Sequence, residues 1–338
     1  MRWTVYNRRK MNMKLVLPPD YIKQATELVK KAEKRIFLIS MVIADHPATH
    51  ALIAALEEAA KRGVTVTVTA DIFTYGEVSG GFLPLKYYSP GVKEVNHMVK
   101  SLKAAGVKFL WLGRGRITLL NGRTHTKWCV VDNTCFVFGG VNMYQGGIAE
   151  NTDYMFRLEN NRLADRLGYE QNRIAKAERT STNYPSVTYE LEGNSVLIDG
   201  GIIAHSVIYR RALELAKEAS HIVFVSQYCP TGKLARILKK KDVELYFNRP
   251  EQADTLNRIL IRLSMLTSGL KTRYIKEPYL HAKFIIFTME DGSRVAITGS
   301  HNFAFTGVLF GTREIALETA DPAIIDQLES FYETYIKA

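Results

Sequence analysis

Two stretches of this 338-residue sequence share one pattern, and that pattern decides the expected fold. Residues 125–142 read HTKWCVVDNTCFVFGGVN, and residues 281–302 read HAKFIIFTMEDGSRVAITGSHN. In both stretches His-x-Lys precedes an apolar run, a polar turn follows, and a second apolar run ends in Gly-Gly-x-Asn or Gly-Ser-x-Asn. Two apolar runs around a polar turn predict a β-hairpin. The spacing from Lys to Asn is 15 positions in the first copy and 19 in the second, and a longer turn at 290–293 absorbs the difference.

The polar residues of the two copies form a matched set of candidate site residues. Side chains alternate along a strand, so the His and Lys of each copy point to the same side of the sheet. The set consists of two histidines, two lysines, two asparagines and one serine: His125, His281, Lys127, Lys283, Asn142, Asn302 and Ser300.

This set of side chains suits a phosphodiester. Two lysines supply positive charge and two asparagines supply amide donors for the phosphoryl oxygens and for the charge of the transition state. One neutral histidine can attack phosphorus while a protonated one gives its proton to the departing alkoxide. We expect no metal and no other cofactor, because the sequence shows no acidic cluster of the kind that Mg²⁺ or Ca²⁺ prefers.

The segments that precede each copy repeat one α/β plan. Helical periodicity at 19–33 is followed by a buried strand at 35–43, a helix at 50–62 and an alternating strand at 64–69. The same order of helix, strand, helix and strand returns at 204–219, 222–228, 233–241 and 243–247. We therefore expect an α/β protein made of two duplicated α-β-α halves, residues 1–180 and 195–338, joined through the polar segment 180–186.

Composition and charge are those of a globular protein with an excess of cations. The 46% hydrophobic and 23% charged residues exclude wholesale disorder and a collagen-like fibre. The 45 Lys and Arg outnumber the 34 Asp and Glu by 11, which favours nucleic acid, an anionic membrane surface or a phosphorylated substrate as partner. Three cysteines without a C-x-x-C pair indicate neither a zinc site nor a disulfide framework and fit a reducing cytoplasm.

No stretch of the sequence predicts a signal peptide or a membrane span. The apolar run at 15–19 is too short for a signal peptide, and the run at 36–44 is too short to cross a bilayer. We expect a soluble or peripheral protein. The stretch 73–103 has no counterpart in the second half, and its segment GGFLPLKYYSPG at 80–91 is either a small local core or an exposed patch that enters a lipid interface.

The repeated H-x-K-x4-D and G-G/S-x-N motifs resemble the HKD signature of the phospholipase D superfamily, and the duplicated plan extends over nearly the whole chain. The resemblance implies a bilobal α/β fold whose halves pair around a pseudo-two-fold axis, with one active site at their interface. It also implies that His125 is the nucleophile that forms a phosphohistidine and that His281 is the general acid and later the base. The lysines and asparagines would bind the phosphate.

The same resemblance implies a carboxylate partner for each histidine. Family members orient each histidine through an acidic residue downstream of its own motif, and the matching positions are Asp153 and Glu314. A carboxylate on one ring nitrogen fixes the tautomer and makes the other nitrogen more basic.

The second copy departs from the signature at Thr288, where the pattern has Asp. In the first copy Asp132 lies five residues after the lysine, near the far end of its strand, and we interpret it as a carboxylate of the hairpin turn. The substitution at 288 then affects local structure rather than chemistry. In an alternative alignment Asp291 takes this place.

Several phrases, at 59–66, 104–110, 123–127 and 139–142, are similar to bacterial cardiolipin synthases. This similarity implies a phosphatidyltransferase or phospholipase D that acts on a phospholipid substrate, with an anionic membrane surface as partner and a cytoplasmic, peripheral location. Apolar residues at 82–85, 87–88 and 308–310 could lower the site onto acyl chains. For 308–310 the alternative is packing in the core.

The alternative function is a nucleic-acid phosphodiesterase, a nuclease of the same superfamily. The net charge and the basic runs at 8–10 and 239–241 support it, whereas a short basic run is commonly a solvated helix end. Nucleic acid is therefore the less favoured partner. No obligate protein partner is evident from the sequence.

Overall fold

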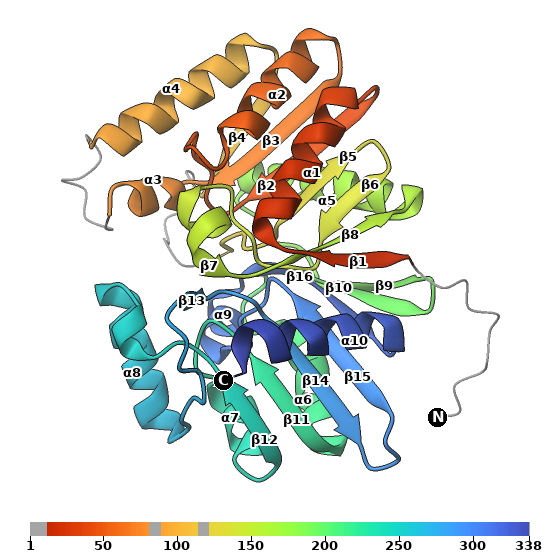
Figure 1. The fold of residues 1–338 in the computed structure, drawn as a ribbon, viewed down its shortest axis with the longest axis vertical. Coiled ribbons are helices and arrows are strands. Elements are labelled where there is room, and N and C mark those ends of the chain that lie inside the picture. The colour runs from red at the N-terminus through yellow and green to blue at the C-terminus, as the bar shows by residue number, and fades with distance from the viewer. Residues whose placement is uncertain (1–11, 81–88, 114–121, 338) are drawn as a thin grey trace.

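The computed structural model describes residues 12–80, 89–113 and 122–337. These residues form two seven-stranded sheets and one two-stranded pair. In Figure 1 the first sheet occupies the upper part of the molecule and the second sheet the lower part.

The first sheet has the strand order β1-β8-β6-β5-β2-β3-β4. Its strands are β1 (Met13–Val16), β2 (Arg35–Ser40), β3 (Thr65–Asp71), β4 (Lys108–Leu112), β5 (Trp128–Val131), β6 (Thr134–Val137) and β8 (Met155–Glu159). The second sheet has the order β12-β11-β14-β15-β16-β10-β9. Its strands are β9 (Val187–Leu191), β10 (Asn194–Gly200), β11 (Ala219–Val225), β12 (Asp242–Tyr246), β14 (Phe284–Met289), β15 (Arg294–Gly299) and β16 (Arg313–Thr319).

The two sheets share their pairing pattern. β2 is parallel to β3 and antiparallel to β5, and in the same way β11 is parallel to β12 and antiparallel to β14. The hairpin β5–β6 corresponds to β14–β15, and both are antiparallel. The duplicated α/β plan and both hairpins are therefore confirmed.

The helices are α1 (Pro18–Lys31), α2 (His50–Lys61), α3 (Phe73–Val78), α4 (Pro90–Ala104), α5 (Asn161–Thr180), α6 (Val207–Glu218), α7 (Gly232–Leu238), α8 (Thr255–Ser268), α9 (Phe305–Phe310) and α10 (Pro322–Phe331). Short helical turns lie at Gly146–Glu150, Pro250–Gln252 and Tyr332–Ile336. The first residue of α6 is set by a capping hydrogen bond. The Ser206 hydroxyl accepts the Tyr209 N–H at 2.9 Å, so α6 begins at Val207 and not at 204 as predicted.

Three apolar cores lie between the sheets and the helices. One lies between the first sheet and α1, α2 and α4, and another between the second sheet and α6 and α7. The central core joins the inner faces of both sheets with residues of α5 and α10. Alternation along β14 divides its side chains between two cores, since Phe284 and Ile286 lie in the central core while Ile285 and Phe287 face α6.

We retain the division into two halves as a proposal, with one structural detail added. The strand β9 (Val187–Leu191) lies in the stretch between the two predicted halves, and it pairs antiparallel with β10 of the second sheet. The second half of the fold therefore includes residues before 195. The helix α5 ends at Thr180, where the first half was predicted to end.

The turn between β5 and β6 confirms the structural interpretation of Asp132. Its carboxylate accepts the backbone N–H groups of Glu33 and Lys34 at 3.0 and 2.9 Å, and that of Arg35 at 3.0 Å. Asp132 thus ties the hairpin to the start of β2.

The second hairpin has no equivalent carboxylate at Thr288. Asp291 accepts the backbone N–H and the hydroxyl of Ser293 within its own turn, at 2.9 and 2.6 Å. Asp291 therefore does not take the place of Asp132, and the alternative alignment is wrong on this point.

Candidate active site

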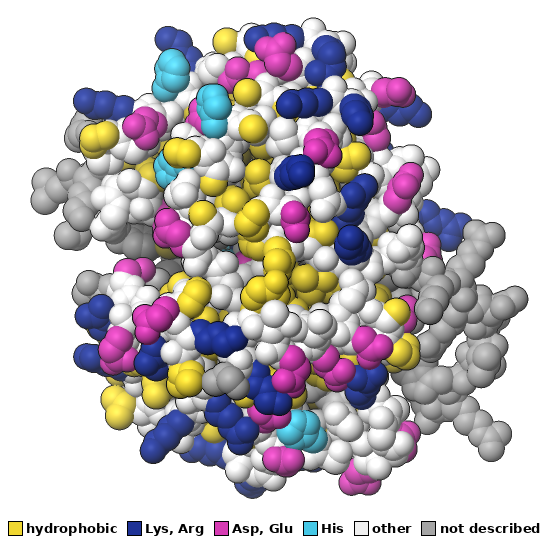
Figure 2. All heavy atoms as spheres, viewed as in Figure 1, with side chains coloured by type: hydrophobic (Ala, Val, Ile, Leu, Met, Phe, Trp, Pro, Cys, Tyr) yellow, Lys and Arg dark blue, Asp and Glu magenta, His cyan; other side chains and the backbone are white. Residues whose placement is uncertain are grey.

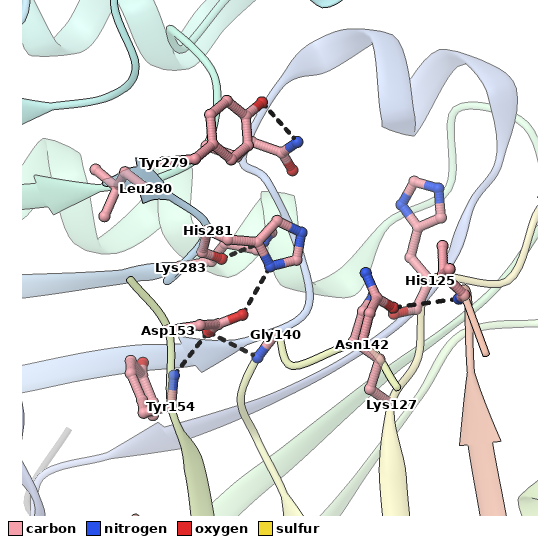
Figure 3. Close-up of polar contacts among 12 residues, drawn as sticks. His125, Lys127, Gly140, Asn142, Asp153, Tyr154, Tyr279, Leu280, His281 and Lys283 are labelled. Carbon is pink, nitrogen blue, oxygen red and sulfur yellow. Dashed lines mark hydrogen bonds and ion pairs between the residues drawn. The ribbon is translucent and has the colours of Figure 1, made fainter. Parts of the chain in front are cut away.

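The two His-x-Lys segments, which lie far apart in the chain, line one cleft between the two sheets. The cleft has a volume of about 270 Å³. Its wall includes all seven residues of the motif set, namely His125, Lys127, Asn142, His281, Lys283, Ser300 and Asn302. Figure 3 shows the imidazoles of His125 and His281 projecting toward the same space from separate segments of the chain, just before β5 and β14.

His281 is held by a carboxylate of the first half. Its Nδ1 lies 2.7 Å from Oδ2 of Asp153, as the dashed line in Figure 3 marks. The backbone N–H of His281 donates to the carbonyl of Thr152 at 3.0 Å. This contact belongs to a small parallel pair between β7 (Asn151–Thr152) and β13 (Tyr279–Leu280), so a strand pairing between the halves sets the distance from imidazole to carboxylate.

His125 is held in the same way by the second half. Its Nδ1 lies 2.9 Å from Oε1 of Glu314, and its backbone N–H donates to the carbonyl of Arg313 at 2.9 Å. Thr124 and Arg313 form an isolated parallel bridge, which corresponds to the β7–β13 pair.

The expected pairing of histidine with carboxylate within each half is therefore wrong. Asp153 and Glu314 do contact the motif histidines, but each contacts the histidine of the other half. The physical reason is the parallel pairing of each His-x-Lys segment with the segment that precedes the opposite carboxylate. A sequence motif does not disclose such pairing.

The two carboxylates are themselves held by the Gly-Gly and Gly-Ser segments. Asp153 accepts the backbone N–H of Tyr154 at 2.8 Å and that of Gly140 at 3.3 Å. Glu314 accepts the hydroxyl of Ser300 at 2.5 Å. Ser300 lines the cleft, and we expect it to act through Glu314, because its hydroxyl already donates to that carboxylate.

The first glycine of each segment is explained by a close approach of two backbones. A Cβ atom at Gly139 would lie 1.9 Å from the carbonyl oxygen of Tyr154, and one at Gly299 would lie 2.2 Å from that of Ile315. Real Cβ atoms do not come this close to a carbonyl oxygen. Glycine therefore lets each hairpin approach the strand that carries the carboxylate.

Both lysines are buried beneath the cleft. The ammonium of Lys127 donates to the carbonyl of His125 at 2.7 Å, and that of Lys283 donates to the carbonyl of His281. Burial lowers the pKa of Lys283 to about 7, although Asp153 acts to raise it. Burial also lowers the pKa of Lys127, against the attraction of Glu314 and Asp153.

The two histidines have unequal surroundings. The side chain of His281 is 11% exposed and that of His125 is 23% exposed. Burial and the nearby Lys283 lower the pKa of His281 to about 4, and these effects outweigh the hydrogen bond with Asp153. At neutral pH the imidazole of His281 is therefore uncharged. Burial opposes the charge of Glu314, yet His125 and Lys127 hold its pKa below the ordinary value.

Both asparagines line the cleft, one from each motif. Oδ1 of Asn142 accepts the backbone N–H of Val42 at 3.4 Å, which orients the amide. Oδ1 of Asn302 is buried and has no hydrogen-bond partner among the described residues, while its backbone carbonyl accepts the hydroxyl of Ser226 at 2.8 Å.

Sequence reasoning missed the residues at the outer part of the cleft. They are mainly aromatic, amide and acidic side chains: Phe73, Glu77, Tyr144, Asn151, Gln227, Tyr228, Gln252, Asp254, Asn257 and Tyr279. One of them carried a signal, since Tyr279 lies two positions before His281 and strand alternation turns both to one side. The others come from α3, α8, β7, a short helical turn and loops, whose approach to the motifs depends on the tertiary fold.

Two carboxylates, Glu77 and Asp254, lie in this outer part of the cleft. Burial raises the pKa of Glu77, and the charge of Asp254 adds to the increase. Asp254 also caps α8 by accepting the backbone N–H of Asn257 at 3.0 Å. The cleft therefore has cationic residues at its base and acidic residues near its opening.

Some predicted features lie outside the described residues, namely the apolar segments 82–85 and 87–88 and the basic run 8–10. For the apolar cluster at 308–310, one residue fits packing in the core and two fit an exposed apolar surface. Val308 is buried in a core, whereas Leu309 and Phe310 are exposed.

Within ranges 12–80, 89–113 and 122–337, no group of three or more His, Cys, Asp or Glu side chains is arranged to hold a metal ion. None of the helices in the described part of the chain is long and apolar enough to cross a membrane.

Comparison with known families supports the assignment that the two motifs suggested. Residues 25–174 match the family model described as "Cardiolipin synthase, PLD-like domain". Residues 25–174 therefore form a domain of the phospholipase D type, in agreement with the superfamily that the motifs suggested. This domain supports an enzyme of the phosphodiesterase or transphosphatidylase type. A comparison with curated protein sequences found no match.

Solved structures share this fold. The phosphatidylserine synthase of Haemophilus influenzae superimposes with a TM-score of 0.71 at 14% identity, over 96% of this chain and 87% of that one. The polyphosphate kinase of Porphyromonas gingivalis gives a TM-score of 0.62 at 12% identity, over 96% of this chain and 46% of that one. At these identities the likeness concerns the fold. The α/β fold class predicted from the sequence is thereby confirmed.

Proposed function

We propose that this protein is a phosphatidyltransferase or phospholipase D that acts on phospholipid phosphodiesters through a phosphohistidine intermediate, with cardiolipin synthase-like transfer as the favoured reaction. One observation carries the proposal. Two histidines, each with Nδ1 on a carboxylate, line a single cleft together with two buried lysines. Since Nδ1 is occupied, the other ring nitrogen, Nε2, remains for chemistry.

The reaction then has two displacements. In the first, Nε2 of His125 attacks phosphorus, a P–N bond forms, and the P–O bond to the leaving alcohol breaks. His281 gives that alcohol its proton. In the second, His281 removes a proton from an incoming alcohol or water, whose oxygen forms a new P–O bond as the P–N bond breaks. Lys127 and Lys283 offset the negative charge that develops on the phosphoryl oxygens.

The protonation state of His281 sets the order of events. A pKa of about 4 keeps the ring of His281 neutral at pH 7 before a diester binds, so the ring must gain a proton before it can act as an acid. A phosphodiester brings a negative charge that offsets Lys283 and Lys127, the cations that hold this pKa down. Substrate binding therefore comes first and raises this pKa, so that Nε2 of His281 takes up a proton from solvent and can then donate it to the leaving alcohol.

The outer cleft favours a lipid over nucleic acid. A nucleic-acid strand would carry several phosphates past Glu77 and Asp254, and both carboxylates repel them. A phospholipid with a single phosphodiester can place that group at the lysines and keep its acyl chains outside the cleft. The choice between transfer and hydrolysis depends on whether an alcohol or water enters for the second displacement.

The proposal is tested by incubating the protein with phosphatidylglycerol vesicles and, separately, with single-stranded DNA. Cardiolipin as product supports the transferase, and phosphatidic acid supports the phospholipase. Cleavage of DNA without lipid turnover would overturn the proposed substrate. Quenching in alkaline detergent, in which a P–N bond persists, with phosphate-labelled lipid as substrate should trap a labelled histidine in wild type and in His281→Asn, but not in His125→Asn. Label retained in His125→Asn would contradict the assigned nucleophile.

A further inference from the structure

The helix α8 (Thr255–Ser268) has an apolar face that nothing in the described structure covers. Ile259 is 51% exposed, Leu263 is 53% exposed and Leu266 is 80% exposed. These three residues are spaced by four and three positions, so they form one stripe on the helix. Leu260, 44% exposed, lies at the edge of this stripe.

The opposite face of the same helix is already packed. Ile261 is fully buried, and Met265 packs against the core on the outer side of the second sheet. A helix at the surface of a globular protein normally has one apolar face, which it turns to the core. The second apolar face of α8 therefore indicates an additional apolar partner.

Charge on and near α8 identifies the kind of partner. The 14 residues of α8 include two cations, Arg258 and Arg262, and no acidic residue. Both arginines are exposed and follow the same side of the exposed stripe. An amphipathic helix with apolar residues on one face and arginines beside them is typical of helices that lie in the headgroup region of an anionic bilayer.

The neighbouring helix α7 extends this positive charge. α7 contacts α8, and Lys233 and Arg236 of α7, with Lys240 after it, line an open groove that also includes Lys217 of α6. Figure 2 shows hydrophobic and basic side chains together at the lower left of the molecule, where Figure 1 places α8. The acidic residues of this region, Glu251 and Asp254, lie before the first residue of the helix, and Glu251 is 3.9 Å from Arg262.

The position of α8 connects this surface to the candidate active site. Asp254, which caps the helix, and Asn257, in its first turn, both line the cleft. The helix is about 21 Å long at 1.5 Å per residue, so one end lies at the cleft and the other extends over the second half. A membrane that holds α8 has its phosphates beside the opening of the cleft.

We infer that the exposed face of α8, formed by Ile259, Leu260, Leu263 and Leu266 with Arg258 and Arg262, docks the enzyme on an anionic lipid membrane. The inference rests on the proposed action on phospholipids and specifies the surface through which that action would occur. Apolar side chains of this stripe enter the acyl boundary, and the arginines contact the headgroup phosphates.

The test compares wild type with Leu263→Asp/Leu266→Asp in sedimentation with phosphatidylglycerol-containing vesicles. The double variant should bind these vesicles at least about tenfold more weakly. It lacks the free energy that two leucine side chains gain when they move from water into the bilayer. Arg258→Gln/Arg262→Gln should bind roughly fivefold more weakly per arginine on anionic vesicles and change little on phosphatidylcholine vesicles. Tyr169→Ser removes a comparably exposed hydrophobic side chain from α5 and is the matched control that should bind like wild type.

Two further measurements separate this inference from the proposed function. Turnover of the water-soluble diester bis(p-nitrophenyl) phosphate should be equal in wild type and the leucine variant, since neither leucine lines the cleft. If wild type does not cleave this diester or any lipid, the proposed function fails while vesicle binding still tests the surface. Equal vesicle binding by wild type and the leucine variant would overturn the inference. So would a wild-type dimer that the leucine variant converts to monomer without loss of vesicle binding, because the face would then join two copies.

Discussion

Asp153 accepts a hydrogen bond from His281 at 2.7 Å although the two residues are 128 positions apart in the sequence. Glu314 holds His125 at 2.9 Å in the reciprocal arrangement. Each half of the fold therefore supplies a histidine and also the carboxylate that orients the histidine of the other half. A site built in this way is complete only when the two halves are packed together.

The first prediction concerns these two carboxylates. Asp153→Asn and Glu314→Gln should each lower kcat by about 10³-fold or more, because an amide can stabilise the wrong imidazole tautomer and does not stabilise the imidazolium. The measurement is turnover of a soluble phosphodiester together with thermal unfolding. Asp132→Asn, which alters a carboxylate outside the cleft, serves as control and should retain kcat. Retention of kcat in both site variants would contradict the role of the crossed pairs.

The second prediction concerns the pH dependence of anion binding. Since the pKa of Lys283 is lowered to about 7, the lysine loses its charge as pH rises through 7. Sulfate keeps its charge over this range, so its affinity should fall about fivefold between pH 7 and pH 8, as expected for loss of one proton. Calorimetric titration with sulfate measures this change. Lys283→Met should bind sulfate weakly with a flat profile, and a flat profile in wild type would be inconsistent with the lowered pKa.

The same lysine affects stability with the opposite trend. The folded protein releases this proton near pH 7, whereas the unfolded chain keeps it until about pH 10.4, the ordinary pKa of lysine. Between these values the unfolded state binds more protons, so Lys283 makes the free energy of unfolding rise with pH in this window. Denaturant unfolding of wild type and Lys283→Met at pH 7 and pH 9 checks the sign, and the pH-dependent part should be smaller in the variant.

The third prediction separates the two hairpin turns. Asp132→Ala should lower the free energy of unfolding by about 1–2 kcal/mol, since three backbone N–H groups of the first half lose their acceptor. Asp291→Ala should cost less, because its carboxylate serves only Ser293 in its own turn. Chemical denaturation of both variants provides the comparison. An equal decrease in the free energy of unfolding for the two variants would show that the hydrogen bonds between Asp132 and the start of β2 contribute little.

The fourth prediction concerns backbone approach at the Gly-Gly segment. Gly139→Ala should destabilise the fold by roughly 1–3 kcal/mol or more, because its Cβ meets the Tyr154 carbonyl and the strands must move apart. Gly307→Ala is the control. Its nearest neighbour would be 3.4 Å away, and alanine favours the helix. Comparable melting temperatures for the two variants would be incompatible with this close contact.

The sequence by itself determined the α/β class, the duplication and the residues of both motifs. The alternation of His125 with Lys127, and of His281 with Lys283, is a local property, because a strand turns every second residue to one face. Local spacing also identified the turn position of Asp132. Local spacing could not decide which carboxylate contacts which histidine. A hydrogen bond between residues 128 positions apart leaves no periodic pattern in the sequence.

Only the tertiary structure decided which carboxylate serves which histidine, which aromatic and acidic side chains surround the opening of the cleft, and where an apolar face stays uncovered. Parallel pairing between β7 and β13 brings Asp153 to His281, and burial in the wall of the cleft lowers the pKa values of His281 and Lys283. In the sequence the leucines of α8 fit an ordinary amphipathic helix with its apolar face turned to the core. The structure shows that the opposite face is the packed one and that these leucines are exposed. Sequence patterns report which residues share a face, whereas contacts between faces and their desolvation arise from the packing of distant segments.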